Sequence, residues 1–412
     1  MHAFCHRRIL KLLIGAFFVV VPCTPAQVPS EPYAEIDRDA VNYAGPGRDA
    51  AHDLAGPEIK IGFLAPLQGP RKAEGDALLQ AARLAIEDEA RNPLPEGRRL
   101  VLATRDESGP WGRASSEIVR LVLDDRAVAL VTSTNGGAAH LAEQVGNKVG
   151  VPVLTLSTDK TTTQINLPWI FRLGPTDAVQ ARAFAQDIYR ERGLTRVVLV
   201  TERDHDGRVG GQEYEKAARE FTAGNSNALT PVRVAVDSTL TDPASVVKEI
   251  TAQKPEALVF WTGPETATKL VAQLREASPS VSIYLCRKAA QGSFEDPPSG
   301  RCRTCAHSPG PTFGGAEDGG VWTVASRSGD TAVRESFEQR YRERTGSSPS
   351  LAAAQAYDAV RVLAGALRRS GPNRPRLRDS VAETSNFPGA SGSISFDGAG
   401  NNLAQVTLVR IH

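Results

Sequence analysis

The chain has 412 residues, too many for one hydrophobic core, and its 41% hydrophobic and 23% charged residues are ordinary for a globular protein with more than one domain. The formal net charge of +1 argues against a nucleic-acid partner, which usually requires a strongly basic face. Beyond residue 54, no apolar run approaches the roughly 18 residues that a membrane span needs, so no span is expected in the mature chain.

The N-terminus has the layout of a secretory signal peptide. Three basic residues precede a ten-residue apolar run, 12–21, and small residues follow that run. The run is too short to span a membrane, and the order of basic, apolar and small segments is typical of an exported protein. We therefore expect removal of residues 1–26 by cleavage near Ala26, and a periplasmic location.

Cys23 leaves a second interpretation of the leader open, because a cysteine after an apolar run can be lipidated. Pro22 directly before it fits a lipoprotein signal poorly. The stretch that follows, 27–57, has Pro, Gly and Asp scattered without a period, and it is expected to form a flexible leader.

From residue 58 onward, short apolar runs alternate with amphipathic stretches, which is the pattern of a parallel sheet covered by helices. A first set ends near a Gly-Pro break at 174–175, and a second set follows it. Strands are expected at 59–64, 100–103, 128–131, 151–156, 197–201, 232–236, 257–261 and 281–285. Helices are expected at 138–148, 178–191, 211–221, 244–253 and 265–276, with others before the second and third strands.

The remainder of the chain breaks this rhythm. Residues 296–320 are rich in Pro, Gly and Cys. After them we expect a strand at 321–325 and helices at 332–344, 351–369 and 376–383. The chain then turns to β structure, and the pattern predicts a hairpin between 391–396 and 405–411.

Hydroxyl residues follow two neighbouring strands at the point where each strand ends. Ser133 and Thr134 come after 128–131, and Ser157 and Thr158 come after 151–156. In an open parallel sheet, ligands bind beyond the carboxyl ends of the strands. The same residue types also serve as ordinary helix caps and turn residues, and that alternative stays open.

An ordered set of motifs gives the chain a specific resemblance. It consists of IKIGFLAPLQGP (59–70), VTSTNGG (131–137), PVLTLSTDKTTT (152–163), WIFRLGPTD (169–177), AAQAYDAVRVLAGAL (353–367) and GASGSISFDGAGNN (389–402). Over 58–412 the chain resembles a type I periplasmic solute-binding protein, of the leucine/isoleucine/valine-binding branch of ABC transporter receptors. The Cys-rich insertion is the main departure from that family.

The resemblance implies an α/β fold with two Rossmann-like lobes, each built on a parallel sheet, joined by a three-strand hinge. Lobe one would comprise 58–174 and 325–387. Lobe two would comprise 175–324 and 388–412. Such lobes close on a solute by a hinge motion.

The resemblance also assigns roles to residues of lobe one. Ser133 with Thr134 or Thr132, and Ser157 with Thr158, would hold a ligand carboxylate, because hydroxyl donors suit an anion without a buried counter-charge. Gln68, in the loop after the first strand, would face the same cleft.

Lobe two departs from the pattern of amino-acid binders. Asp206 stands where relatives carry an aromatic residue, and Cys286-Arg287-Lys288 contains no acid to pair with a ligand ammonium. Lys288 would attract an anion, so a carboxylate without an amino group is favoured, unless these basic side chains are simply solvated. Trp261 is expected to give apolar cover or to pack in the core.

The cysteines allow a different class of function. Cys302 and Cys305 form a CxxC pair, which could be a redox or metal motif. In an exported protein a disulfide is favoured, joining Cys286 to Cys302 or Cys305, or Cys302 to Cys305.

Other signals of chemistry are weak. The adjacent Asp204, His205 and Asp206 cannot all face one ion, so no metal ligands are predicted. No nucleophile elbow, zinc-protease motif or P-loop is present, and we expect neither an enzyme nor a cofactor.

These observations predict an extracytoplasmic solute-binding protein. It would act as a monomer, capture a small carboxylate or amino-acid-like ligand in an interlobe cleft by hinge closure, and pass the ligand to the membrane permease of an ABC transporter. The alternatives are a sensory ligand-binding subunit, a ligand-free accessory protein, and a redox or metal-dependent enzyme that uses Cys302 and Cys305.

Overall fold

A computed structural model describes residues 42–109, 111–163, 168–224, 229–291, 319–326 and 330–411. The expected signal peptide, Cys23, Cys302 and Cys305 lie outside these ranges. Within them, no helix has both the length and the apolar character that crossing a membrane requires.

The first sheet has five parallel strands in the order β2-β1-β3-β4-β5. Every residue of β3 and β4 is buried, as expected for short Val- and Leu-rich strands covered on both faces. The strands are β1 (Glu58–Ala65), β2 (Arg99–Asp106), β3 (Ala129–Thr132), β4 (Val153–Thr155) and β5 (Ile170–Arg172).

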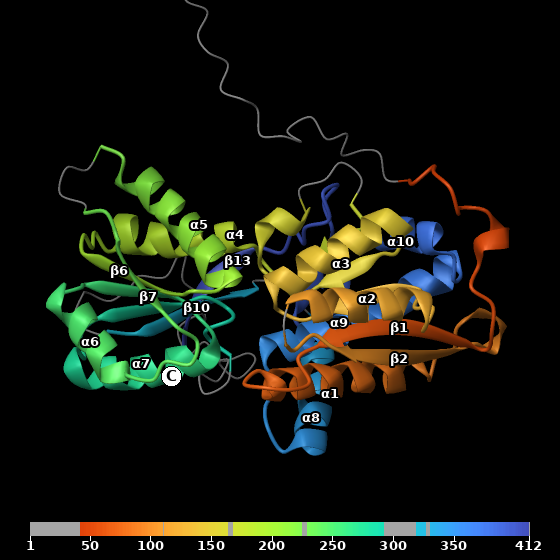
Figure 1. Ribbon diagram of the computed structural model, residues 1–412, viewed down its shortest axis with the longest axis horizontal. Coiled ribbons are helices and arrows are strands. Elements are labelled where there is room, and N and C mark those ends of the chain that lie inside the picture. The colour runs from red at the N-terminus through yellow and green to blue at the C-terminus, as the bar shows by residue number, and fades with distance from the viewer. Residues whose placement is uncertain are drawn as a thin grey trace, which may run out of the picture. The chain divides into compact units, whose positions relative to one another are not determined.

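Helices cover both faces of this sheet. Buried residues of α1 (Lys72–Glu89) and α9 (Leu351–Ser370) share one core cluster with the sheet, and those of α2 (Trp111–Leu123) and α3 (Gly136–Val149) share another (Figure 1). Two further helices complete this half: α8 (Thr331–Thr345) and α10 (Arg374–Ala382). The short 3-10 turns are η1 (Ala50–His52), η2 (Pro95–Gly97) and η3 (Lys160–Thr163).

Helix α3 begins and ends where its sequence requires. The side chain of Asn135 accepts a hydrogen bond from the backbone N–H of Ala138, which caps the N-terminus. Gly150 follows the last turn with φ of 66°, a left-handed conformation that glycine adopts without strain. These caps place the polar residues 133–135 at the end of β3 that meets α3.

The second sheet has six strands in the order β13-β10-β9-β8-β6-β7. All neighbours are parallel except β13, which runs antiparallel to β10. Its strands are β6 (Val197–Glu202), β7 (Val232–Val236), β8 (Ala257–Trp261), β9 (Ser282–Leu285), β10 (Val321–Ser326) and β13 (Val406–Ile411).

Four helices flank the second sheet in two pairs (Figure 1). One pair is α4 (Asp177–Ala185), which continues as the π-helical turn η4 (Gln186–Glu191), with α5 (His205–Thr222); the other is α6 (Pro243–Ala252) with α7 (Pro264–Ala277). The two parallel-sheet halves agree with the predicted α/β fold class.

The predicted C-terminal hairpin is wrong. Residues 387–389 (β11, Phe387–Gly389) pair with β12 (Gly392–Ile394) in a small separate ribbon. The last strand, β13, pairs instead with β10, some 80 residues earlier in the chain. The alternating pattern identified both strands but could not identify their partners.

The core clusters bear on the expected division into lobes. Ala390, Ile394 and Phe396 pack with the buried residues of the first sheet, although the resemblance assigns 388–412 to lobe two. Ile411 and Val324 pack with the second sheet. The division into lobes therefore stays a prediction. We place the point at which the chain re-enters lobe two at β13 and not at residue 388. Below, lobe one and lobe two denote the halves that contain the first and second sheet.

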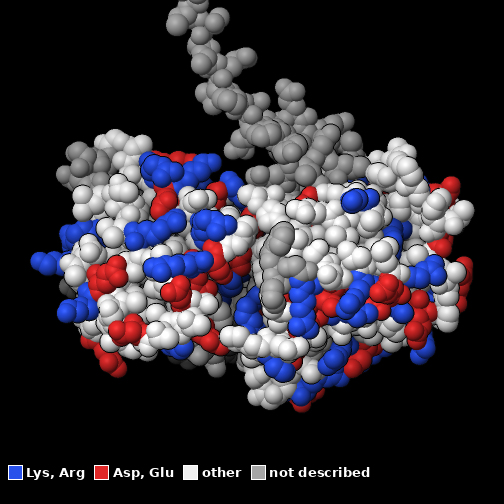
Figure 2. Space-filling model, in the orientation of Figure 1, with Lys and Arg blue, Asp and Glu red and all other residues white. Residues whose placement is uncertain are grey.

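Charges are mixed on the molecular face drawn in Figure 2. Lys and Arg side chains alternate there with Asp and Glu side chains and do not gather into a patch of one sign. This agrees with the near-neutral composition.

Candidate functional site

The hydroxyl residues of lobe one follow two strands that are direct neighbours. Thr132 of β3 lies in register with Thr155 of β4, and their hydroxyl oxygens are 2.8 Å apart. Ser133, Thr134, Ser157 and Thr158 therefore leave the sheet at the same edge. This is the edge at which open parallel sheets bind ligands.

Ser133 and Thr134 donate hydrogen bonds to carboxylates of the protein itself. The Ser133 hydroxyl lies 2.6 Å from Oε1 of Glu107, and the Thr134 hydroxyl lies 2.6 Å from Oε1 of Glu74. Arg71 joins the two acids, with a two-pronged contact to Glu74 and a 3.1 Å contact to Glu107. The hydroxyl groups that the resemblance assigns to a ligand carboxylate thus donate their hydrogen bonds to Glu107 and Glu74 instead.

The two acids of this cluster differ in their electrostatics. Burial raises the pKa of Glu107 to about 7, against the lowering effect of Arg71 and the Ser133 hydroxyl. Its second oxygen, Oε2, is buried without a hydrogen-bond partner among the described residues. Burial would also raise the pKa of Glu74, but the charge and hydrogen bond of Arg71, the Thr134 hydroxyl and the charge of Lys288 together lower that pKa. Glu107 can therefore change charge near neutral pH.

Thr158 connects lobe one to the start of lobe two. Its hydroxyl donates a hydrogen bond of 2.7 Å to Oδ1 of Asp177, the first residue of α4. Trp261 donates from Nε1 to the same oxygen at 3.0 Å. Burial raises the pKa of Asp177 to about 6. Ser157, by contrast, points inward, and its hydroxyl accepts from the backbone N–H of Asp159.

Lys288 is not an unpaired cation. Its Nζ lies 2.7 Å from Oδ2 of Asp206 and 3.5 Å from Oδ2 of Asp204. Burial alone would lower the pKa of Lys288, but these two carboxylates raise it above its usual range. Asp206 also accepts a hydrogen bond from the backbone N–H of Gly136, so it links lobe two to the N-terminus of α3.

Two adjoining cavities lie at this edge. Cavity A encloses about 340 Å³, including space open to solvent. Its described lining combines two basic residues, two amides, two hydroxyls and three aliphatic side chains, and it contains no acid: Thr134, Leu156, Thr158, Arg287, Lys288, Gln291, Leu351, Ala352 and Gln355.

Cavity B encloses about 240 Å³, measured in the same way. It shares Thr158 and Lys288 with cavity A, but its lining is acidic: Asp177, Glu202, Asp204 and Asp206, with Gly207, Trp261, Thr262 and Cys286. From the sequence, Asp206 was the one acid proposed for the lobe-two side of the cleft, and Cys286-Arg287-Lys288 offered none to pair with an ammonium group. The structure brings four carboxylates there, from the starts of α4 and α5 and from the end of β6.

The predicted ligand-binding residues divide into two groups. Five line the cavities: Thr134, Thr158, Asp206, Trp261 and Lys288. Three do not: Gln68 is exposed on its loop, where its backbone bonds with Ser108, and Ser133 and Ser157 are buried beside the cavities. Whether any of them touches a ligand stays a prediction.

Some lining residues were not singled out from the sequence. Asp177 and Gln355 lie within the motifs WIFRLGPTD and AAQAYDAVRVLAGAL, so those motifs could have pointed to them. Glu202 gave no such signal, because an acid at a strand end is common on any surface. In the structure it is buried and accepts a hydrogen bond from Thr266.

Cys286 borders cavity B as a buried free thiol, and burial raises its pKa to about 12. It forms no disulfide with any described residue. The other two disulfide candidates, Cys302 and Cys305, lie outside the described residues, so their pairing stays a prediction.

Comparison with known proteins identifies the family. Residues 58–293 match the family of periplasmic binding proteins. A curated relative is the Leu/Ile/Val-binding protein BraC3 of Rhizobium johnstonii, 24% identical over 180 residues, which are 43% of this chain and 49% of that protein. The match thus spans about half the length of the relative.

Solved structures show the same fold. One is the branched-chain amino acid transporter substrate-binding protein LivJ of Streptococcus pneumoniae in complex with isoleucine, with a TM-score of 0.67 and 21% identity over 86% of this chain and 99% of that one. Another is a solute-binding protein of an ABC transporter from Rhodopseudomonas palustris in complex with 3,4-dihydroxybenzoic acid, with a TM-score of 0.70 and 18% identity over 87% and 94%. With more than half of its length matched, the chain belongs to the periplasmic binding protein family.

Proposed function

We propose that this protein captures a small carboxylate-bearing solute between its two lobes, outside the cytoplasm, and delivers it to the permease of an ABC transporter. The observation that carries the proposal is the convergence of both sheets on cavities A and B. Thr158 of lobe one and Lys288 of lobe two line both cavities, while Thr134 of lobe one lines cavity A and Asp206 of lobe two lines cavity B. Capture then needs hinge closure and no bond making.

The charges of cavity A favour a carboxylate. Arg287 and Lys288 border cavity A together with the amides of Gln291 and Gln355, and these groups can donate hydrogen bonds to an anion. Leu156 and Leu351 offer apolar contact to the rest of the solute. A carboxylate bound here would meet donors, and no acid, among the described lining residues.

The acidic lining of cavity B bears on whether the bound solute can also carry an amino group. Four carboxylates stand there against one lysine, so an ammonium group beside Trp261 would find counter-charge. Structures of this fold hold both kinds of solute, since the S. pneumoniae protein binds isoleucine and the R. palustris protein binds 3,4-dihydroxybenzoic acid. Both amino acids and acids without an amino group are therefore candidates here.

A thermal-shift screen of the purified mature protein tests the proposal. The panel holds leucine, isoleucine, benzoate, 3,4-dihydroxybenzoate, keto and hydroxy acids, amides and polyols. A solute at 100 times its Kd stabilises the folded state by about 2.7 kcal/mol, which gives a clear rise in Tm. We expect solutes that carry a carboxylate to raise the Tm. A panel in which only uncharged solutes stabilise the protein would contradict the proposal.

Lys288→Glu is the variant that tests the role of cavity A. It would place a third carboxylate beside Asp204 and Asp206 and remove a donor from the cavity, so carboxylate binding should weaken at least about tenfold, or by 1.4 kcal/mol or more. The matched control is Lys248→Glu on the exposed side of α6, which should leave binding unchanged. Equal affinities of the two variants would exclude Lys288 from the site.

A further inference from the structure

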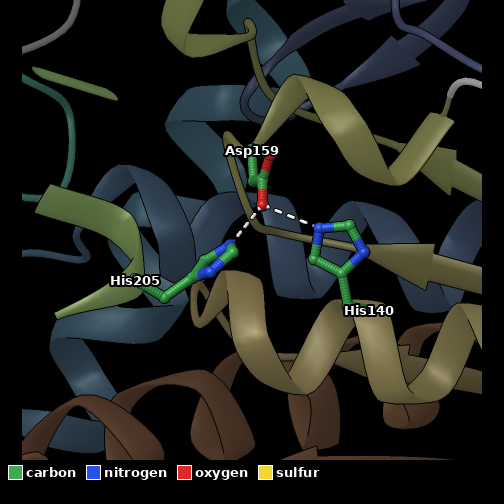
Figure 3. Close-up of side chains that lie close together, drawn as sticks. All are labelled: His140, Asp159 and His205. Atoms are coloured by element: carbon green, nitrogen blue, oxygen red, sulfur yellow. Dashed lines mark hydrogen bonds and ion pairs between the residues drawn. The ribbon is translucent and has the colours of Figure 1, made fainter. Parts of the chain in front are cut away.

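A cluster of metal-binding side chains lies at the contact between the lobes and outside cavities A and B. His140 extends from α3, Asp159 follows β4, and His205 is the first residue of α5 (Figure 3). Both imidazoles reach one carboxylate oxygen, and Nε2 of His140 also lies 2.8 Å from the hydroxyl oxygen of Thr161. Nε2 of His140 lies 3.0 Å from Oδ2 of Asp159, and Nε2 of His205 lies 2.6 Å from it.

We propose that His140, Asp159 and His205 form a binding site for a divalent transition-metal cation of the zinc class, which joins the two lobes when they are closed. Two imidazole nitrogens and one carboxylate oxygen are a donor set that zinc accepts, with a fourth position left for water. The three donor atoms lie within 4.8 Å of one another. Zinc bonds of about 2.0–2.2 Å require donors roughly 3.3 Å apart, so shifts below about 1 Å suffice.

The surroundings orient the carboxylate for this role. Its other oxygen, Oδ1, accepts hydrogen bonds from the backbone N–H of Thr161 at 2.9 Å and from the Thr161 hydroxyl at 2.7 Å. Oδ2 is thereby directed to the histidines, as outer partners orient ligands in metal sites. The Asp159 side chain is 1% exposed, whereas those of His140 and His205 are 28% and 33% exposed, which leaves an approach for the ion.

Two cationic side chains near the cluster must be compatible with the ion. Arg172 donates to the backbone carbonyls of Ser157 and Asp159 and not to the Asp159 carboxylate, so it does not compete for Oδ2. Arg208 approaches Nδ1 of His205 at 3.4 Å. A metal at Nε2 places the proton on Nδ1, so Arg208 has to turn away, and its exposed position permits this.

His205 faces a different partner from Asp204 and Asp206, the residues on either side of it in the sequence. Asp204 and Asp206 turn to Lys288, while His205 turns to Asp159 of lobe one. His140 and Asp159 belong to lobe one and His205 to lobe two, so the donor set is complete only when the lobes meet. A bound cation would therefore favour the closed arrangement of the lobes. Binding of the cation can be measured with no solute present.

Calorimetric titration of the EDTA-treated mature protein with Zn²⁺ tests the inference. We expect one ion per chain, a rise in Tm with Zn²⁺, and no rise with Mg²⁺, which prefers oxygen ligands. His140→Ala and His205→Ala should each weaken Zn²⁺ binding at least about tenfold. His52→Ala is the matched control, because His52 also contacts an aspartate, Asp49, but at an exposed turn; it should bind as the unaltered protein does.

The same titration distinguishes the competing sites. It is repeated in a Cys302→Ser/Cys305→Ser background, so that zinc held by the cysteines is removed. Absence of stoichiometric binding in that background overturns the inference. Binding lost in His140→Ala but retained in His205→Ala overturns the link between the lobes. Melting of each variant in EDTA shows whether it is folded, and in either variant the remaining histidine still contacts the buried Asp159 carboxylate.

Discussion

Glu107 is the residue at which burial and charge conflict most clearly. Its side chain is almost fully buried, and only one of its oxygens is hydrogen-bonded among the described residues. Arg71 stabilises its charged form, but desolvation opposes that form and prevails, so its pKa stands near 7 rather than at the 4.5 of a free glutamate.

The raised pKa of Glu107 predicts a stability that falls as pH rises. Between pH 4.5 and 7 the folded state holds a proton that the unfolded chain releases, so its contribution is complete below pH 4.5 and is lost as pH passes 7. The loss is of the order of 3 kcal/mol. Glu107→Gln should reduce the fall in unfolding free energy between pH 5 and pH 8, as measured by urea unfolding, and leave the smaller fall that Asp177 contributes with its pKa of about 6.

Glu335→Gln on α8 is the control for that measurement. Glu335 is exposed, so its substitution should leave the pH profile of the unfolding free energy unchanged. If Glu107→Gln also left the profile unchanged, Glu107 would be ionised throughout, paired with Arg71 as an ordinary ion pair.

At the scale of the element, α5 is shaped by a single aromatic ring. Trp261, at the end of β8, lies against the α5 backbone at Gly210, and an added Cβ there would come within 1.9 Å of the indole. The ring also lies beside Phe184 and Tyr214 and donates to Asp177 in cavity B. The glycine thus permits a helix–strand contact that also positions a cavity wall.

Gly210→Ala should therefore destabilise the protein by about 1–3 kcal/mol, because the indole has to move within a filled core. Gly365→Ala on α9 is the matched control. Its Cβ would have only ordinary contacts, the nearest at 3.8 Å, and it should stabilise the protein by roughly 0.5–1 kcal/mol through helix propensity. Urea unfolding measures both, and a Gly210→Ala variant as stable as the unaltered protein would mean that the indole does not pack there.

The elements also show how far the sequence could be interpreted. Strands such as β7 and β8 were predicted to the residue, because a short apolar run between polar turns has few other states available. The partner of β13 could not be predicted, since alternation determines a strand and its buried face but not which of several distant edges it joins.

At the scale of the whole molecule, the site was predictable only in part. Thr134, Thr158 and Lys288 were found from motifs at strand ends, because the topology of parallel sheets brings strand ends together. The side chains that contact these residues could not be predicted from motifs at strand ends. The acids that neutralise Lys288 lie more than 80 residues before it, and His140 meets His205 only through contact between the lobes.

That contact between the lobes can be tested at one glycine. Gly136 opens α3, and a Cβ there would lie 2.5 Å from Oδ1 of Asp206 and 3.1 Å from the ring of His205. Gly136→Ala should therefore oppose closure while leaving lobe one folded. We expect at least about tenfold weaker binding of the solute identified in the thermal-shift screen, because an overpacked contact costs about 1–3 kcal/mol.

Gly137→Ala provides the control for Gly136→Ala, since it adds the same methyl group to the same turn of α3. Its Cβ would contact only the Asn135 side chain, at 3.3 Å, and nothing from lobe two. Titration calorimetry gives the Kd of each variant, and small-angle scattering with the solute present reports whether the lobes close. If Gly136→Ala binds and closes as Gly137→Ala does, the N-terminus of α3 does not meet α5 in the ligand-bound protein. If only Gly136→Ala stays open, the contact between Gly136 and Asp206 is part of the closed state.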